Sequence, residues 1–112
     1  MKTKELEHSK THITAEIIEY VPNSVVIKTI LKKPTGSVKL MSFDSGEGLT
    51  ERINLFDTFA QVIDGKADIV INGKSNFLVT GQSIVIPAHI PNSIKPNGRF
   101  KIILTVIKSS YE

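Results

Sequence analysis

The chain has 112 residues, of which 40% are hydrophobic, and its 14 basic and 11 acidic side chains give a formal net charge of +3. This length suits one domain with a usable core and leaves no room for a second domain. Because the chain has no cysteine, disulfide bonds, thiolate metal sites and cysteine nucleophiles are excluded.

The charged groups and the apolar stretches also bear on location and partners. The first ten residues are highly charged and lack the apolar run of a signal peptide, and no apolar stretch approaches the roughly 20 residues needed to span a bilayer. We expect a soluble, cytoplasmic protein that does not bind membranes. The basic residues are scattered, with only a doublet at Lys32 and Lys33, and no aromatic residues are interleaved to stack on bases. We therefore predict no nucleic-acid partner.

Residues 1–23 form a predicted N-terminal arm. Within it, residues 14–20 fit either a helical turn or a strand, because Ile13, Ile17 and Ile18 have helical spacing but the segment is short. Pro22 followed by Asn23 ends the segment in either case.

Residues 24–112 predict a single β domain. Apolar and polar residues alternate in segments rich in Val, Ile, Phe and Thr, which is typical of strands. These segments are 24–31, 37–43, 58–63, 67–71, 76–79, 82–86 and 100–107. Turn residues separate them at 34–36, 45–48, 64–65, 72–73 and 96–98. Asp64-Gly65 and Asn72-Gly73 are the strongest hairpin signals. Many short strands at this spacing indicate an all-β sandwich or barrel.

The first of these segments has apolar residues on both faces. Val25 and Ile27 lie on one face, while Val26 and Ile30 lie on the other. One interpretation is that the strand packs against the sheet of a second subunit, which predicts a homodimer. The other is that Val26 and Ile30 cover a local loop, and the pattern leaves both interpretations open.

Glycines and prolines between residues 46 and 96 follow a regular spacing. The first block runs from Gly46 through Arg52, Asn54 and Thr58 to Gly65, and after 15 residues the second runs from Gly81 through Pro87, His89 and Asn92 to Pro96. This spacing resembles that of the two motifs of small single-domain cupins. The resemblance implies an all-β cupin jelly-roll barrel, also called a double-stranded β-helix, preceded here by a short N-terminal arm. It also supports the homodimer, because small cupins commonly pair through their sheets.

The resemblance also identifies the positions at which the family holds a metal ion with three His and one Glu. Position by position, these fall on Arg52, Asn54, Thr58 and Asn92. None of these residue types is a typical ligand of a transition metal, and Arg has no lone pair to donate. We therefore expect neither a metal nor another cofactor.

Two histidines in the arm and one in the second motif are candidate site residues. His8 and His12 have the i, i+4 spacing of a helical metal pair, but no acidic ligand accompanies them, and we predict no site there. His89 replaces a Gly of the family pattern and follows Pro87 at the rim of the expected pocket. It is a candidate for ligand contact or proton transfer, and the alternative is an exposed turn residue without a task.

The motif positions predict a pocket of mixed character. If Thr58 points inward, Ala60 and Val62 point inward as well, and their small side chains leave room for a ligand. Arg52, Asn54 and Asn92 would then add a fixed cation and two amides, which suits a small anionic or polyhydroxylated molecule. In the alternative, the polar groups bond to one another in a closed barrel and Arg52 turns to solvent.

Two acidic residues adjoin motif positions, and we predict no catalytic role for either. Asp57 and Glu51 each lie one residue from a motif position, which places them on the opposite face of a regular strand. We predict that both lie at the rim or on the surface.

From these patterns we predict a metal-independent cupin barrel that binds a small polar or anionic molecule without turnover. The predicted ligand-binding residues are Arg52, Asn54, Thr58, His89 and Asn92, and none is predicted to be catalytic. The alternative is a cupin enzyme, either a metal-free sugar isomerase or epimerase with His89 as its base, or, less favoured, a metal-dependent dioxygenase. An interaction module with a closed barrel is a third possibility.

Overall fold

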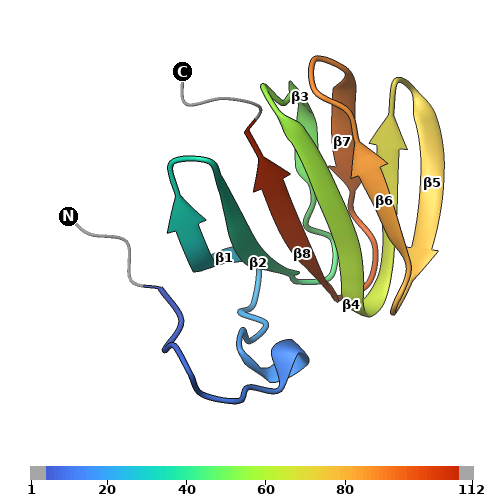
Figure 1. The fold of residues 1–112 in the computed structure, drawn as a ribbon. Helices are drawn as coiled ribbons and strands as arrows, with labels where there is room; N and C mark the ends of the chain where they lie inside the picture. Colours follow the sequence, from blue (N-terminus) through green and yellow to red (C-terminus); the bar gives the residue numbers. More distant parts are fainter. Residues whose placement is uncertain (1–4, 109–112) are drawn as a thin grey trace.

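The computed structural model describes residues 5–108, and almost all of the regular structure in this range is β-strand (Figure 1). The only other element described is a single 3₁₀ turn, η1 (Thr14–Glu16). The strands are β1 (Val25–Lys33), β2 (Gly36–Phe43), β3 (Leu49–Ile53), β4 (Asp57–Ile71), β5 (Lys74–Val79), β6 (Ser83–Ile86), β7 (Pro91–Lys95) and β8 (Phe100–Ile107). Between residues 5 and 108, no helix has the length and apolar character needed to cross a bilayer. The all-β prediction is confirmed.

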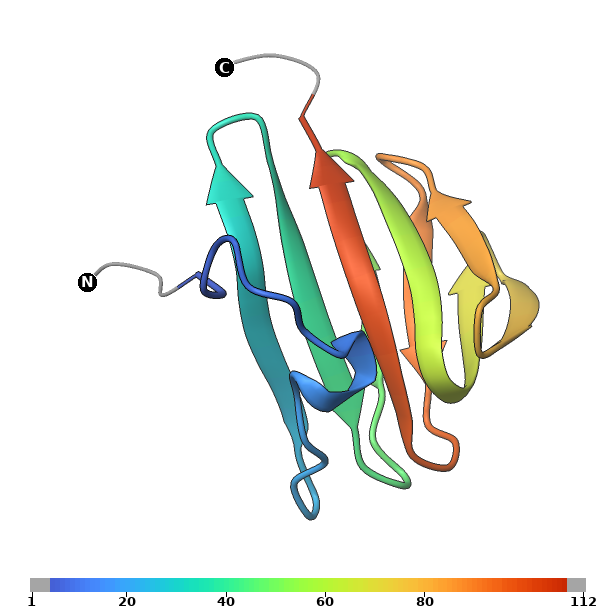
Figure 2. The ribbon, with the colours of Figure 1, turned by 60° about the horizontal axis from the view of Figure 1, so that its bottom comes forward.

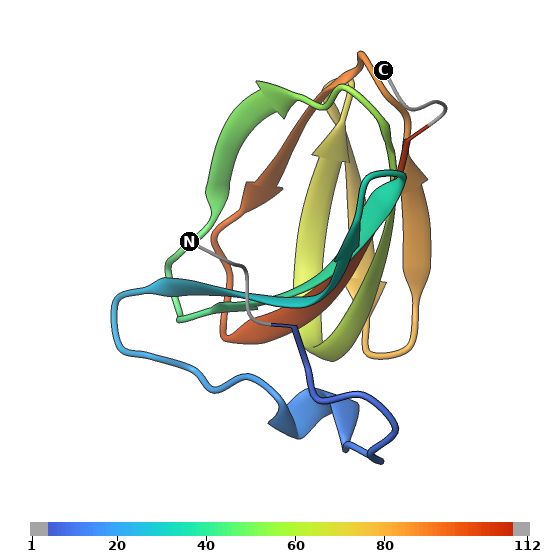
Figure 3. The same ribbon diagram turned by 60° about the vertical axis from the view of Figure 1, so that its left-hand side comes forward.

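Two antiparallel sheets face each other and share β4. The first sheet has the order β1-β2-β8-β4-β6, and the second has the order β5-β4-β7-β3. Figure 3 shows β3 and β7 lying across from the sheet that contains β1, β2 and β8. The core fills the space between the sheets, where the rings of Phe43 and Phe100 stack with centroids 4.4 Å apart. This arrangement is the jelly-roll barrel that the sequence predicted.

Strand β4 corrects one hairpin prediction. Asp64-Gly65 does not form a turn, because β4 continues through it from one sheet into the other. The register with β8 shifts between Val62 and Asp64, and Gly65 has a φ of +82°. A Cβ at Gly65 would collide with the carbonyl of Arg99, so the position requires glycine for a bulge within a strand.

The other strong hairpin signal was correct. Asn72 and Gly73 connect β4 to β5, and both have positive φ, 51° and 79° respectively. These values fit a two-residue type I′ turn, which matches the right-handed twist of the flanking strands.

Two strands were missed from the sequence, and both carry motif residues. Strands β3 and β7 have five residues each and pair with one another, with Arg52 opposite Asn92. Their sequences lack a clean alternation because the register shifts between Leu49 and Arg52, and β7 begins at Pro91. A bulge and a strand-initial proline both weaken the period-two signal.

The N-terminal segment lies across the outer face of the first sheet (Figure 2). The Ser42 hydroxyl donates to the carbonyl of Glu19 at 2.8 Å, and the Lys101 ammonium donates to the carbonyl of Ala15 at 2.6 Å. Ile18 is only 3% exposed, and it borders the same groove as Val26. The arm of the same chain therefore covers part of the outer face of β1, as the local-loop interpretation predicted for Val26. The division of the chain after residue 23 stays a prediction.

Candidate functional site

A cavity of about 500 Å³ opens between the two sheets. Its walls come from β1, β2, β3, β4, β6, β8 and the β3–β4 loop: Ile27, Lys39, Met41, Leu49, Arg52, Asn54, Leu55, Phe56, Thr58, Ile86, Leu104 and Val106. Eight of these twelve side chains are apolar, and none is acidic or a histidine. This volume is in the range of small-molecule sites in proteins, roughly 300 to 1,000 Å³.

Arg52 reaches this cavity from β3 and is half-buried. Burial lowers the pKa of its guanidinium, because desolvation penalises the charged form. The group nevertheless remains a cation at neutral pH, because arginine is not deprotonated in proteins. The acidic side chains that form ion pairs within residues 5–108 are Glu5, Glu7 and Asp44, and none of them pairs with Arg52. Arg52 is thus a fixed cation without an acidic partner in the described part of the chain.

Asn54 and Thr58 also line the cavity, and they interact with each other. The Asn54 amide donates to the Thr58 hydroxyl at 3.4 Å, and that hydroxyl donates to the carbonyl of Phe56 at 3.4 Å. The alternation along β4 is as predicted, because Thr58, Ala60 and Val62 are buried while Phe59 is 40% exposed. Part of the hydrogen-bonding capacity of this pair is therefore used within the protein.

Lys39 is a second cation in the cavity, and our sequence reasoning missed it. It lies on β2 and shares a face with Met41 and Phe43, because side chains two residues apart point the same way along a strand. It forms no ion pair with the acidic side chains of residues 5–108. The sequence could have indicated Lys39, because it is the lysine at the same period-two positions as the core residues of its strand and so points to the same side as they do.

Asn92 does not line the cavity. It is 1% exposed, and its amide donates to the backbone carbonyls of Arg52 and Ile90 at 3.3 Å each. The structure therefore places it behind Arg52, and its predicted contact with a ligand stays untested.

His89 and Asp57 also lie outside the cavity wall. His89 is exposed and has a φ of +66°, the left-handed conformation that the Gly of the family pattern adopts without strain. Its backbone N–H donates to the carbonyl of Asn54 at 2.8 Å, so its backbone is tied to a cavity residue. Asp57 is exposed and accepts a hydrogen bond from the backbone N–H of Ala88 at 2.8 Å. Its position agrees with the alternation argument.

The side chains at the motif positions do not fit a transition metal. Arg52, Asn54, Thr58 and Asn92 offer a cation, two amides and a hydroxyl in place of imidazoles and a carboxylate. Across residues 5–108, no three side chains of His, Cys, Asp or Glu gather closely enough to hold a metal ion. The geometry instead offers two cations above an apolar wall.

Comparison with known proteins identifies the fold. No protein-family model and no curated protein matches the chain. Among solved structures, a conserved protein of unknown function from Streptococcus pyogenes matches with a TM-score of 0.89 and 22% identity, over 98% of this chain and 96% of that one. A cupin superfamily protein from Desulfitobacterium hafniense matches with a TM-score of 0.87 and 26% identity, over 97% of this chain and all of that one.

A third solved structure is a cupin 2 conserved barrel domain protein from Leptotrichia buccalis. It is 33% identical with a TM-score of 0.81, over 84% of this chain and 46% of the longer protein. A salicylate 1,2-dioxygenase from Pseudoaminobacter salicylatoxidans shares the fold at 19% identity and a TM-score of 0.70, over 84% of this chain and 28% of the enzyme. Together with the jelly-roll topology, these matches show that the chain has the cupin fold, in a form similar to that of small cupin superfamily proteins.

Proposed function

We propose that this cupin binds a small polar or anionic molecule in its cavity, without a metal ion and without turnover. The observation that carries the proposal is that Arg52 and Lys39 both line one cavity that has no acidic side chain in its wall. Two like charges beside apolar walls repel each other and are poorly solvated, so an anion that compensates them is favoured. Arg52 can also hold a carboxylate through two parallel hydrogen bonds.

The same wall argues against acid/base catalysis. A metal-free isomerase requires a base within hydrogen-bond reach of its substrate. The cavity wall has no His, Asp or Glu, and His89, the candidate that the motif supplies, lies outside it. This chain spans only 28% of the dioxygenase that shares its fold, and the similarity between them concerns the fold alone.

Location and assembly are further parts of the proposal. We place the protein in the cytoplasm, with a second copy of the chain as a partner through β1. Leu31 on β1 is 37% exposed, and such a contact would remove it from water.

A thermal-shift screen of organic acids, nucleotides and neutral sugars tests the proposal. We expect anions to raise the Tm of the wild-type protein, because a ligand that binds only the folded state stabilises it. The Arg52→Met variant should lose these shifts while it keeps its fold. Shifts from neutral sugars alone, or equal shifts in the variant, would overturn the proposal. If the protein isomerises a compound found in the screen, and His89→Ala abolishes this reaction but still binds the compound, the enzyme alternative replaces the binding proposal.

A further inference from the structure

The polar groups of the cavity are arranged to bind charge more than to form many hydrogen bonds. The Thr58 hydroxyl already accepts from Asn54 and donates to the carbonyl of Phe56. The Asn92 amide is directed to two backbone carbonyls behind the wall. The remaining donors of the wall are mostly those of Arg52 and Lys39. A polyol would leave several hydroxyls unpaired against the apolar walls, and unpaired buried polar groups are costly.

Two exposed apolar side chains lie on the same cavity. Ile27 on β1 is 58% exposed and Leu55 in the β3–β4 loop is 70% exposed, and both belong to its wall. Strands β1 and β3 are the terminal strands of their sheets and do not pair with each other. Single exposed apolar residues are ordinary, but here two separate elements bring them to one opening. A ligand with an apolar body would bury both.

We infer that the cavity takes an organic anion with an apolar body, that is, a carboxylate carried by an aryl or branched alkyl group. The carboxylate lies between Arg52 and Lys39, and the hydrocarbon part packs against Ile27 and Leu55. This inference rests on the proposed function and narrows its ligand class, since it excludes sugars and sugar acids as the preferred ligands.

Three probes separate the contributions of charge and body. Phenylacetate has both features, phenylacetamide keeps the body without the charge, and glucuronate keeps the carboxylate on a polyol body. We expect isothermal titration to show phenylacetate binding at least about tenfold more tightly than either of the others, because a charge-assisted hydrogen bond and apolar burial each contribute at this scale.

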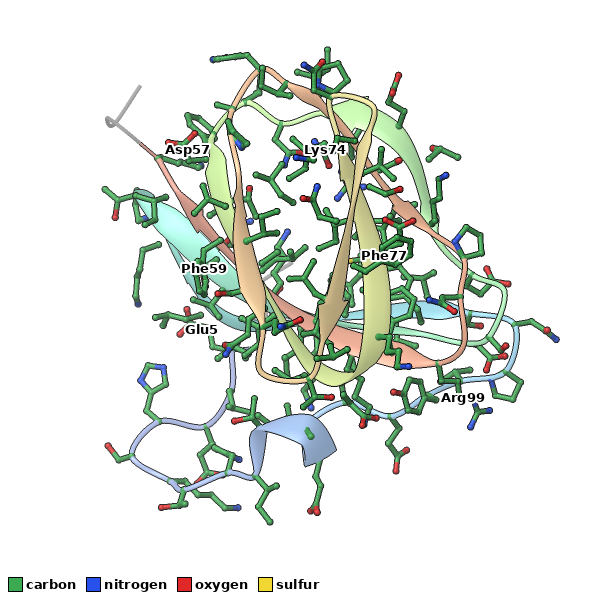
Figure 4. All side chains as sticks on the ribbon, turned by 90° about the vertical axis from the view of Figure 1, so that its right-hand side faces the viewer. Glu5, Asp57, Phe59, Lys74, Phe77 and Arg99 are labelled. Atoms are coloured by element: carbon green, nitrogen blue, oxygen red, sulfur yellow. The ribbon has the colours of Figure 1, made fainter. Side chains whose placement is uncertain are left out.

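Matched variants locate the site. Leu55→Ser should lower the affinity for phenylacetate several-fold and leave the affinity for glucuronate unchanged. Phe77→Ser is the control: Phe77 lies on β5 (Figure 4), is 74% exposed and is not part of the cavity wall. Lys39→Met should lower the affinity for both anions. Lys74→Met removes an equal charge from the exposed start of β5 and should leave both affinities unchanged.

The outcomes distinguish this inference from the proposal on which it rests. If glucuronate binds more tightly than phenylacetate and both are lost in Lys39→Met, the apolar-body inference is overturned while anion binding stands. If phenylacetate binds Leu55→Ser and Lys39→Met as tightly as it binds the wild-type protein, it binds elsewhere and the inference is wrong. If neither these anions nor any acid of the thermal-shift screen binds, both the proposed function and this inference are wrong.

Discussion

Asn92 supports Arg52 from behind, through its backbone. The two residues are opposite each other in the β3–β7 pair, and the Asn92 amide donates to the carbonyl of Arg52 at 3.3 Å. Its second bond, also 3.3 Å, goes to the carbonyl of Ile90. Asn92 therefore joins the strand that carries the cavity cation to the second cupin motif, and we interpret it as a positioning residue.

Replacing Asn92 should affect stability first. Asn92→Ala leaves the carbonyls of Arg52 and Ile90 without these donors in a buried place, so we expect a loss of about 1 to 3 kcal/mol in the free energy of unfolding. Asn92→Asp should cost more, because it places an acceptor where two donors were needed. Urea unfolding measures both values. An unchanged unfolding free energy in both variants would contradict the positioning role.

The arm is held to the barrel by a tyrosine whose ionisation is suppressed. The Tyr20 hydroxyl donates to Asp64 at 2.6 Å, and Lys101 lies 4.8 Å from the centroid of its ring. The pKa of Tyr20 is raised, mainly because the hydroxyl is partly buried and secondly because it donates a hydrogen bond to Asp64.

This shift predicts a pH dependence with a definite sign. Because the folded pKa is above the unfolded value of about 10, the unfolded state loses the proton first as pH rises. The contribution of Tyr20 to stability is therefore complete below about pH 10 and decreases above it. Tyr20→Phe should be less stable at neutral pH, and its stability should fall less between pH 9 and 11 in chemical denaturation at each pH. Parallel curves for the two proteins would show that Tyr20 does not have this role.

The purified protein should hold no stoichiometric transition metal. The reason is the donor set of Arg52, Asn54, Thr58 and Asn92, which lacks an imidazole, a carboxylate and a thiolate. Elemental analysis after purification without a metal-affinity step checks this. Near one equivalent of iron, manganese, nickel or zinc per chain that survives dialysis would refute it.

The predicted homodimer concerns β1. The strand has a bulge at Ile30, whose carbonyl accepts a hydrogen bond from the N–H of Leu6 at 3.0 Å. We expect sedimentation at micromolar concentration to show a dimer and Ile30→Lys to weaken it, with Phe77→Ser as a control on another exposed apolar side chain. A wild-type protein that sediments only as a monomer would contradict the prediction, and the arm would then remain as the partial cover of this strand.

The cupin barrel could be predicted because its signals are local in the sequence. Both the spacing from Gly46 to Pro96 and the period-two alternation can be recognised in the sequence without knowledge of tertiary contacts. The error at Gly65 has a clear cause, because the same dipeptide serves a hairpin turn or a bulge. What decides between them is the approach of Arg99, a residue 34 positions later in the chain.

The cavity was predicted in part, and the missing part was not local. Arg52, Asn54 and Thr58 were found because the motif marks them, whereas Lys39 lies outside the motif, on a strand that pairs with β1 and β8 beside the cavity. Asn92 is in the motif, but the sequence could not show that its amide faces backbone carbonyls. Side-chain direction at a bulged strand pair is set by tertiary contacts, and alternation does not determine it.

The most direct test of the account is the affinity of Arg52→Met for the anion that gives the largest thermal shift. The variant keeps much of the apolar stem and removes the charged donors, so we expect it to fold normally and to bind about 1.5 to 3 kcal/mol more weakly, or about tenfold to a hundredfold. Lys74→Met, titrated in parallel, should match the wild type. Unchanged affinity of Arg52→Met for every anion that binds would contradict the account, because the cation that defines the cavity would then have no role in binding.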